Sequence, residues 1–198
     1  MNHLREKFII VGAGFFGLTL AERISSVFDI EVAVIEKRNH IGGNAFSYKD
    51  AKTGIEIHKY GSHIFHTSSE EVWQYVNNFA EFNSYQHHVW TNLNDTIYSL
   101  PINLVTLQQF FGKTFSTTEA MDFFEGFKQS GRAENLEQKA INTVGPELYK
   151  AFIQGYTTKQ WGINPNLLPS ETISRLPVRP TWNTRYFSDT YEGIPKEG

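Results

Sequence analysis

The start of the chain alternates between apolar runs and a helical pattern. Residues 8–11, FIIV, form an unbroken apolar run, which is typical of a strand buried on both faces in a parallel sheet. Phe16, Leu20 and Ile24 then recur every four positions, as on one face of a helix. The run EVAVIEK at 31–37 predicts a second strand. The order strand, helix, strand predicts the first part of a βαβ unit.

Helical patterns dominate the stretch from about residue 70 to 160. Ser-x-x-Glu at 68–71, and again at 116–119, matches the capping box that begins many helices. A third helix is predicted over 135–143. Pro146 suits the first turn of a fourth, because a helix leaves that N–H without a partner in any case.

Strand-like segments are few and short. IEIH at 55–58 alternates like a strand, and residues 84–100 predict irregular or strand structure. Five of the seven prolines lie between 165 and 195, a density that rules out a long helix. Residues 163–198 therefore predict strands and loops, and no partner strands for them are evident from the sequence.

Three glycines separate the first strand from its helix. In GAGFFG, Gly12 would make the tight turn, Gly14 would let the backbone approach a pyrophosphate, and Gly17 would let the helix pack on the strand. The helix N-terminus adds free N–H groups and a partial positive charge. Glu36 ends the second strand, at about the place where an acidic side chain accepts hydrogen bonds from a ribose. The pattern favours a dinucleotide site over the alternative, a tight turn in an empty α/β domain.

A second glycine turn favours FAD over a nicotinamide cofactor. Gly42 and Gly43 follow the acid within EKRNHIGGNAFS, residues 36–47, where a simple nicotinamide domain is expected to run on into another helix. The placement resembles FAD-binding proteins of the glutathione-reductase and amine-oxidase type. The residues predicted to bind FAD are Gly12, Gly14, Phe15, Gly17, Glu36, Lys37, Arg38, Gly43, Asn44, Gly61, Ser62, His63 and Ile64.

Composition narrows the classes of function. With 40% hydrophobic and 20% charged residues, the chain has the make-up of a soluble globular protein, and its net charge of −3 argues against nucleic acid as a partner. The chain has no cysteine, which excludes disulfides, cysteine-bound metal and thiol nucleophiles. This fits a reducing cytoplasm. Neither a signal peptide nor a membrane span is expected from the sequence.

Three histidines gather in HKYGSHIFHT, residues 58–67. His63 and His66 have a spacing that could bind a metal from a helix, but no carboxylate cluster accompanies them and Gly61 indicates a turn. A buried polar strand end is another possibility. We expect no metal and favour a loop against a flavin ring, which Gly61 would let the backbone approach and which His63 would contact.

Aromatic and arginine residues gather further along the chain. Phe152 and Tyr156 share a predicted helix face, and Trp161 follows. An aromatic stripe is usually core, but glycines beside these aromatics and arginines in 174–179 and 184–189 favour another interpretation. Aromatics that stack a base, together with arginines that fork onto phosphates, form the kind of site that a nucleotide sugar needs.

Taken in order, these motifs resemble the UDP-galactopyranose mutases, a family of flavoenzymes. The resemblance rests on GAGFFG, EKRNHIGGNA, HKYGSHIFHT, GYTTKQWG and the segment from RLPVR through RYF to GIP. It implies that reduced FAD is the active cofactor. In this family flavin N5 attacks the anomeric carbon of the sugar, UDP leaves, and the sugar adduct opens and recloses as a furanose without net oxidation.

The resemblance also implies roles for particular residues. Phe152 and Tyr156 match uridine-stacking residues, and His63 matches a histidine beside the flavin. A further group matches pocket or diphosphate-binding residues: Thr157 and Trp161 line the substrate pocket, Arg175 belongs to a mobile loop that closes on the diphosphate, and Tyr186 contacts the diphosphate. Arg179 competes with Arg175 for that diphosphate role. We expect catalysis to depend on His63 and Arg175, with the chemistry supplied mainly by the flavin.

The predicted fold is α/β: a Rossmann-like FAD-binding βαβ unit, an inserted helical domain and the beginning of a β-sheet substrate domain. The expected domains are 1–70, 71–162 and 163–198, the last truncated. The family is expected to run to nearly twice this length, so the chain alone is expected to be an incomplete half, its activity doubtful. UDP-galactose is the expected substrate, and a homodimer is possible. The alternatives are an amine-oxidase-like oxidoreductase and a non-catalytic nucleotide-binding fragment. The motifs after residue 150 argue against the oxidoreductase, and the missing half favours the fragment.

Overall fold

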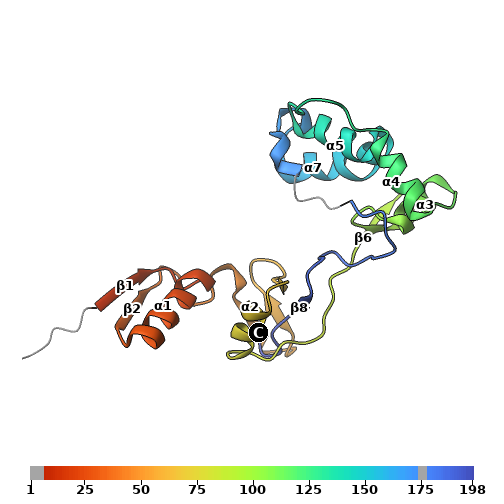
Figure 1. Cartoon of the computed structure of the whole chain (residues 1–198). Coiled ribbons are helices and arrows are strands. Elements are labelled where there is room, and N and C mark those ends of the chain that lie inside the picture. The colour runs from red at the N-terminus through yellow and green to blue at the C-terminus, as the bar shows by residue number, and fades with distance from the viewer. Residues whose placement is uncertain (1–6, 174–177) are drawn as a thin grey trace, which may run out of the picture. The chain divides into compact units, whose positions relative to one another are not determined.

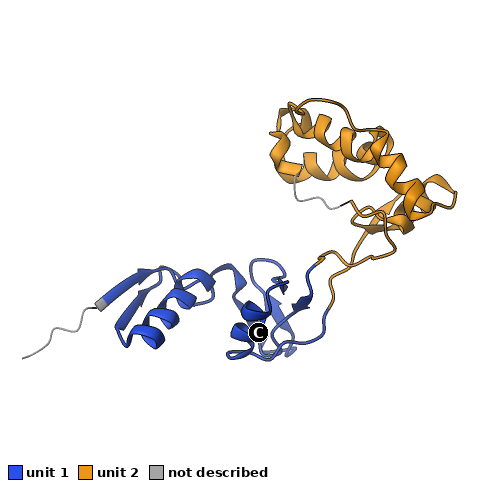
Figure 2. Ribbon diagram, viewed as in Figure 1, with its two compact units in different colours: residues 1–85, 189–198 blue, residues 86–188 orange. Residues whose placement is uncertain are grey.

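A computed structural model describes residues 7–173 and 178–198. The chain divides into two compact units (Figures 1 and 2), one formed by residues 1–85 and 189–198, the other by residues 86–188. The second unit is therefore an insertion into the first. The structure groups the chain by contacts into two units, and the three-domain division expected from the sequence stays a prediction.

Unit 1 contains the glycine-rich segments and is built from short strands and two helices. Strands β1 and β2 form a parallel pair, while β3 with β4 and β5 with β8 form antiparallel pairs. The bounds are β1 Lys7–Val11, α1 Phe15–Phe28, β2 Glu31–Ile35, the 3₁₀ helix η1 Gly43–Ala45, β3 Ser47–Lys49, β4 Glu56–His58, β5 Phe65–Thr67, α2 Glu70–Asn77 and β8 Tyr191–Gly193.

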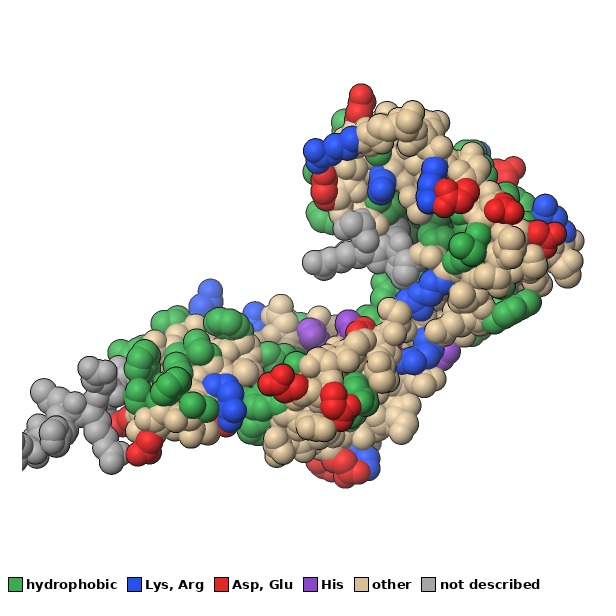
Figure 3. Space-filling view, in the orientation of Figure 1, with side chains coloured by type: hydrophobic (Ala, Val, Ile, Leu, Met, Phe, Trp, Pro, Cys, Tyr) green, Lys and Arg blue, Asp and Glu red, His purple; other side chains and the backbone are tan. Residues whose placement is uncertain are grey.

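The predicted start of a βαβ unit is confirmed. Strand β1 pairs in parallel with β2 along its whole length, from Lys7 opposite Glu31 to Val11 opposite Ile35, and α1 connects them. Apolar side chains are abundant on the surface of this part (Figure 3): Ile9, Val11, Phe15 and Phe16 are 63–83% exposed. Parallel strands usually have both faces covered, and the exposed apolar residues of this pair and of α1 suit such a cover.

The end of the chain returns to unit 1, which corrects the expectation that its strands have no partner. Strand β8 pairs with β5, and Asn83 makes two bonds to the returning chain: its amide donates to the Ile194 carbonyl at 3.0 Å, and its side-chain Oδ1 accepts from the Ile194 amide at 3.0 Å. A carboxylate reinforces the return, since Asp189 bonds His66 at 2.7 Å and Ser68 at 2.9 Å. The sequence did not reveal this pairing because the partners are more than 100 positions apart.

The second helix begins one residue later than the capping pattern suggested. The N-cap of α2 is Ser69, whose Oγ accepts from the Val72 amide at 3.3 Å. Ser68 instead donates to Asp189. Both serines have a hydroxyl that can cap, and the tertiary bond to a carboxylate decides between them.

Unit 2 is a β-hairpin followed by a set of helices. The hairpin pairs β6 with β7, which resolves residues 84–100, expected to be irregular or strand, in favour of strand for its second part. The bounds are β6 Val89–Leu93, β7 Thr96–Leu100, α3 Leu104–Phe111, α4 Thr117–Glu125, α5 Leu136–Val144, α6 Pro146–Leu148, the π-helix η2 Tyr149–Gln154, α7 Gly155–Trp161, and the 3₁₀ helices η3 Pro165–Leu167 and η4 Ser170–Ile173.

The helix starts of unit 2 follow the sequence signals closely. Ser116 and Glu119 form the predicted capping box, with bonds of 3.2 and 2.7 Å in the two directions. Asn135 caps α5 by accepting from Gln138, and Pro146 occupies the first turn of α6 as expected. These local interactions explain why three of the predicted helices lie where the sequence places them.

The buried core belongs to unit 2. It is made by residues of the hairpin and of α3 through η4: Tyr98, Ile102, Leu104, Leu107, Phe115, Ala120, Phe124, Leu136, Ala140, Val144, Leu148, Tyr149, Phe152, Ile153, Leu168 and Ile173. Burial raises the pKa of Tyr149 to about 12, and the Glu137 carboxylate adds to the shift. The tyrosine therefore stays neutral and packs with the apolar residues around it.

A buried polar cluster joins the hairpin to α3. Asn103 is fully buried; its side chain accepts from the Thr106 amide at 3.1 Å and donates to Ser99 at 3.1 Å and to the Pro101 carbonyl at 2.9 Å. The Thr106 hydroxyl donates a hydrogen bond to the Ser99 carbonyl at 2.5 Å. The cluster is satisfied from within, which is the condition under which buried polar groups stabilise a core.

We expect Asn103→Ala to destabilise unit 2 far more than Asn135→Ala, although both asparagines are helix N-caps. Loss of an ordinary cap costs about 1 kcal/mol. Losing Asn103 also leaves buried groups on Ser99 and Pro101 without a partner, for a total of about 3 kcal/mol. Urea unfolding followed by far-ultraviolet circular dichroism measures both. Equal losses would show that the buried bonds of Asn103 add nothing to its capping role.

Candidate functional site

The first glycine turn is shaped by contact between backbone atoms. Gly12 has φ +103°, and its amide donates to the Ile35 carbonyl at 2.7 Å, which ties the end of β1 to the end of β2. A Cβ on Gly17 would lie 2.0 Å from the Gly12 carbonyl oxygen. Gly17 thus serves helix-to-strand packing, as expected, and only glycine fits there.

The second glycine turn packs directly on the first. The Gly42 amide donates to the Ala13 carbonyl at 2.8 Å, and a Cβ on Gly43 would lie 3.0 Å from the Cα of Gly14. Gly42 and Gly43 both have positive φ, +89° and +61°. The two glycine motifs, 30 residues apart, therefore form one continuous backbone surface.

Above that surface there is room for a ligand. A Cβ built on Gly12 meets nothing within 4 Å, and one on Gly14 meets only the Gly43 Cα at 3.8 Å. Gly14 is the N-cap of α1 and has no side chain to cap the helix. The amides of the first helical turn are thus accessible to a bound anion, as in phosphate sites at helix N-termini.

Glu36 braces the turn. Its two carboxylate oxygens accept from the Ala13 amide at 2.7 Å and from the Arg38 amide at 2.8 Å. The amides of Arg38 and Ala13 hold the pKa of Glu36 below its usual range. The carboxylate is therefore ionised at neutral pH, and it retains lone pairs that could accept from a ribose.

A hollow of about 430 Å³ opens beside these residues and is lined by Val11, Gly12, Ile35, Glu36, Lys37, Arg38 and Gly43. Five of these seven had been singled out from the sequence. Val11 and Ile35, the last residues of the two paired strands, were expected only as strand core. Their position follows from the rule that ligands lie beyond the carboxyl ends of parallel strands.

Aromatic and basic side chains stand next to the glycine turns. Arg38 donates to Asn44 at 2.9 Å and lies over the Tyr60 ring at 4.6 Å from its centroid. His40 bonds the Tyr60 hydroxyl at 2.8 Å and stacks on Phe46 at 3.9 Å. Sequence reasoning named Arg38 and Asn44 and missed the other three, because only the fold brings residues 40, 46 and 60 together.

The three histidines of residues 58–67 have separate partners. His63 Nδ1 donates to the Gly61 carbonyl at 2.8 Å, His58 Nδ1 accepts from the His63 amide at 3.3 Å, and His66 bonds Asp189. In neutral His63 this leaves Nε2 as the acceptor. Across residues 7–173 and 178–198, no group of three or more His, Asp or Glu side chains is placed to hold a metal ion.

The turn between β4 and β5 contains the other residues predicted to face the flavin. Gly61 has φ +96°, and a Cβ there would meet nothing within 4 Å, so close approach of a planar ligand is sterically open. Ser62 is exposed and Ile64 half-buried. Phe15, also predicted to contact the cofactor, is 63% exposed at the start of α1. Their contacts with a flavin stay predictions.

In unit 2 the predicted aromatic stripe is divided between core and surface. Phe152 is 9% exposed and packs against Tyr98 and Phe110 at centroid distances of 5.1 and 5.4 Å. Tyr156 and Trp161 are 67% and 55% exposed. For Phe152 the geometry matches the core interpretation that was weighed for the stripe, whereas Tyr156 and Trp161 are available to a ligand.

The remaining predicted substrate residues differ in their surroundings. Thr157 is buried on α7, and Tyr186 is half-buried, with its ring edge-on to Phe187 at 5.1 Å. Arg175, predicted to close on the diphosphate, lies outside the described residues. Their roles in binding therefore stay predictions.

Two segments of the chain match known protein families. Residues 10–79 match the NAD(P)-binding Rossmann-like domain, and residues 151–198 match the family model of UDP-galactopyranose mutase. A probable UDP-galactopyranose mutase of Klebsiella pneumoniae is 42% identical over 195 residues, which is 98% of this chain and 50% of that protein. The chain is a relative of the UDP-galactopyranose mutases.

A second curated protein and a solved structure, both named as mutases, also match this chain. A dTDP-fucopyranose mutase of Escherichia coli is 41% identical and matches over 98% of this chain and 52% of its own length. A crystal structure of reduced UDP-galactopyranose mutase matches with a TM-score of 0.69 at 19% identity, over 89% of this chain and 37% of that one. The mutase-like α/β fold is thereby confirmed, and the chain spans about half the length of the curated relatives it matches.

Within the part of the chain that the structure describes, no helix has the length and apolar character needed to cross a bilayer. Joining this chain to the half of the Klebsiella relative that it does not match gives a protein of the relatives' full length. That protein is called the completed protein below.

We expect Gly14→Leu and Gly17→Ala to fail in different ways. The Gly17 variant loses fold stability, because its Cβ collides with the Gly12 carbonyl oxygen. A Cβ on Gly14 would meet only the Gly43 Cα, at an ordinary contact distance of 3.8 Å, so we expect unit 1 to fold while the larger side chain blocks the approach to the pyrophosphate. Thermal unfolding and flavin content of the purified completed protein separate the two. If purified Gly14→Leu still contained stoichiometric flavin, the glycine turns would not be the pyrophosphate-binding site.

Glu36→Gln should destabilise the chain at pH 7 and cease to matter in acid. Because the folded pKa of Glu36 is lowered, its contribution is present above the unfolded pKa of about 4.3 and is lost as pH falls through the folded value. The urea midpoints of wild type and variant should therefore converge below about pH 4. A constant gap from pH 7 to pH 3 would mean that ionisation of Glu36 is irrelevant.

Proposed function

We propose that the protein to which this chain belongs is a flavin-dependent isomerase that interconverts UDP-galactopyranose and UDP-galactofuranose. The main support is the pair of glycine turns, whose backbone is open to a ligand at Gly12 and Gly14 and is stabilised by the Glu36 carboxylate. It occurs in a chain that is 42% identical to a probable UDP-galactopyranose mutase. The length of the relatives implies that the activity needs more than these 198 residues.

FAD fits the cradle. The amides at the start of α1 would hold the pyrophosphate, Glu36 would accept from the adenosine ribose, and the turn at Gly61–His63 would face the isoalloxazine ring. When bound and reduced, the flavin supplies the nucleophile for ring opening and closure without net oxidation. The protein's part is to hold the cofactor and sugar in position and to stabilise charge.

His63 would act through its free ring nitrogen. Because the Gly61 carbonyl takes the Nδ1 proton, the neutral ring presents Nε2 as an acceptor. A residue fixed in this tautomer can accept a hydrogen bond from the cofactor. We propose that this is how His63 contributes, as a contact to the flavin that needs no proton transfer of its own.

The substrate side of the proposal draws on unit 2. Tyr156 and Trp161 present exposed rings on α7 that suit stacking with a base, and Tyr186 supplies a hydroxyl for the diphosphate. Phe152, Thr157 and Arg175 complete the proposed set from the resemblance. Phe152 would contribute through packing in the core, since so little of it is exposed.

A second substrate has equal support from similarity. The E. coli relative is named dTDP-fucopyranose mutase and is 41% identical, against 42% for the Klebsiella relative. Both names share a nucleoside diphosphate linked to a hexopyranose that changes ring size. The choice between uracil and thymine, and between galactose and its 6-deoxy form, therefore has to be measured.

The test incubates the completed protein with dithionite-reduced FAD and either UDP-galactopyranose or dTDP-fucopyranose, and separates the ring forms by chromatography. We expect furanose product from the UDP sugar without consumption of an oxidant. Product from dTDP-fucose alone would replace the substrate. Stoichiometric consumption of oxygen or nicotinamide would favour the oxidoreductase alternative, and oxidised enzyme should be inactive until it is reduced.

Arg175→Ala in the completed protein should lose turnover and keep its flavin. A guanidinium donates paired hydrogen bonds to phosphate oxygens. Charge-assisted hydrogen bonds are worth about 1.5–3 kcal/mol each, so roughly tenfold to a hundredfold in kcat/KM is expected. Arg175→Lys should recover only part of this. Wild-type kinetics in Arg175→Ala would remove the residue from the diphosphate site.

A further inference from the structure

Arg179 directs its guanidinium to the backbone of its own loop. Nη1 donates to the Arg185 carbonyl at 2.6 Å, and Nη2 donates to the Tyr186 carbonyl at 2.7 Å. These are consecutive peptide oxygens, so the planar fork of the guanidinium holds one short stretch of chain. The side chain is half-buried, and burial, followed by the charge of Arg185, lowers the pKa of Arg179.

The same stretch is held from its other side by the segment that leads into β6. The Tyr186 amide donates to the His87 carbonyl at 2.6 Å, and Arg185 forms a β-bridge with His88. The His87 ring also lies edge-on to that of Tyr186 at 5.4 Å. The peptide at Arg185–Tyr186 is thus fixed between Arg179 and a second piece of backbone.

Arg179 itself is anchored before it reaches across. Its amide donates to the Ile102 carbonyl at 2.9 Å, and its carbonyl accepts from the Thr181 amide at 2.7 Å. The Thr181 carbonyl in turn accepts from the Leu104 amide at 3.1 Å, at the start of α3. The guanidinium therefore projects from a rigid position beside the core of unit 2.

These hydrogen bonds indicate that Arg179 has a structural role in its own loop rather than a role in binding phosphate. A phosphate bound end-on across both terminal guanidinium nitrogens would compete with the two carbonyls to which they already donate. We propose that Arg179 is a positioning residue, which fixes the Arg185–Tyr186 peptide so that the Tyr186 side chain is presented to the substrate diphosphate. The proposal rests on the proposed function, in which Tyr186 makes that contact.

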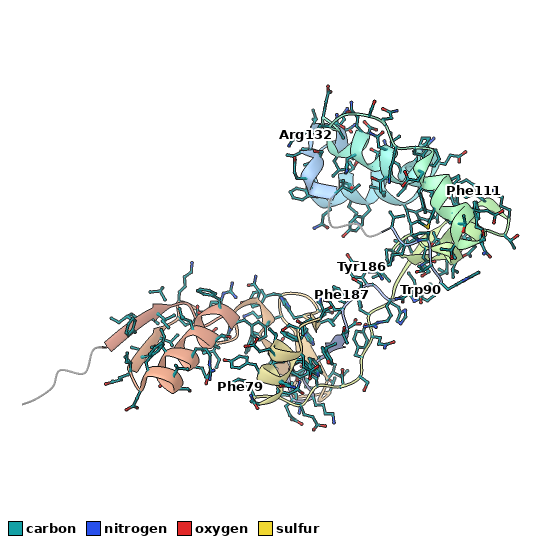
Figure 4. All side chains as sticks on the ribbon, in the orientation of Figure 1. Phe79, Trp90, Phe111, Arg132, Tyr186 and Phe187 are labelled. Atoms are coloured by element: carbon teal, nitrogen blue, oxygen red, sulfur yellow. The ribbon has the colours of Figure 1, made fainter. Side chains whose placement is uncertain are left out.

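Two substitutions and a matched control test it in the full 198-residue chain. Arg179→Gln removes the fork, while Arg179→Lys keeps a charge that can donate to one carbonyl at a time. Arg132→Gln is the control, since Arg132 belongs to the same unit, its side chain is 85% exposed, and it lies well away from Tyr186 (Figure 4). Circular dichroism and the unfolding midpoint establish that each variant is folded.

The first measurement is tryptic cleavage after Arg185. The bond after Arg179 precedes Pro180 and resists trypsin, so cleavage at Arg185 reports on the loop in all variants. We expect Arg179→Gln to speed this cleavage at least roughly fivefold, Arg179→Lys by less, and Arg132→Gln not at all, because local opening exposes the bond. An unchanged rate in folded Arg179→Gln would overturn the clamp.

The second measurement, made on the completed protein, is UDP affinity by calorimetry in a cycle with Tyr186→Phe. Loss of a hydrogen bond to a charged group predicts roughly tenfold weaker binding for Arg179→Gln and for Tyr186→Phe. If Arg179 acts through Tyr186, the double variant is no weaker than either single one. Multiplied losses would show that Arg179 binds UDP independently and overturn the positioning role.

The failure of the proposed function has a different signature. A completed protein without these substitutions that binds no UDP would remove the nucleotide-sugar assignment and with it any role of Arg179 toward the substrate. The cleavage rates would still decide whether Arg179 holds the loop. UDP binding with multiplied losses would instead retain the substrate and reject only the positioning role.

Discussion

Two stretches of backbone pack directly on each other in the candidate cofactor site. The Cα atoms of Gly14 and Gly43 approach so closely that a Cβ on Gly43 would be 3.0 Å from its neighbour, and the Gly42 amide bonds the Ala13 carbonyl. The hollow at the strand ends depends on this packing, because Gly12 and Gly43 both line it. A side chain at Gly43 would push the two turns apart, and the helix N-terminus would lose the second wall of its anion site.

Glu36 matters because it holds the same arrangement together electrostatically. Its carboxylate accepts from an amide in the first turn and from one just after β2, so a single charge ties the two segments. Such bonds are stronger than neutral ones. A residue chosen from the sequence as a ribose ligand is therefore also part of the framework, and its loss would affect the cradle before any ligand arrives.

Local signals in the sequence were sufficient for the elements that local interactions decide. The apolar run at 8–11, the capping box at Ser116 and the helical pattern over 135–143 all predicted elements found in the structure, since each depends on residues within a few positions. The strand β8 was not predictable in this way. Its partner β5 lies more than 100 residues earlier, and three residues alone carry no clear pattern.

Burial divides the candidate substrate residues in a way that periodicity does not show. Phe152 and Tyr156 have the spacing of one helix face, yet the first fills the core beside Tyr98 and the second is 67% exposed. The sequence could not distinguish them, because the difference lies in which residue the distant rings of Tyr98 and Phe110 cover. The sequence likewise could not decide between Arg175 and Arg179 for the diphosphate role. Nothing in RLPVR indicates that Arg179 would bind carbonyl oxygens six and seven positions later.

Because unit 2 is inserted into unit 1, the two parts of unit 1 are joined only when the chain returns to it at residue 189. Unit 1 is completed only when residues 189–198 pair with β5 and with the segment around Asn83, after the whole of unit 2 has intervened. Closing a loop of that length costs entropy, although the cost grows slowly with length. The bonds of Asp189 to His66 and Ser68 stand at the point of re-entry and offset part of that cost. Tyr186, only three residues earlier, ends the part of the inserted unit that Arg179 clamps. The loop proposed to meet the diphosphate is therefore fixed on its unit 2 side by Arg179 and followed at once by the junction that Asp189 anchors in unit 1.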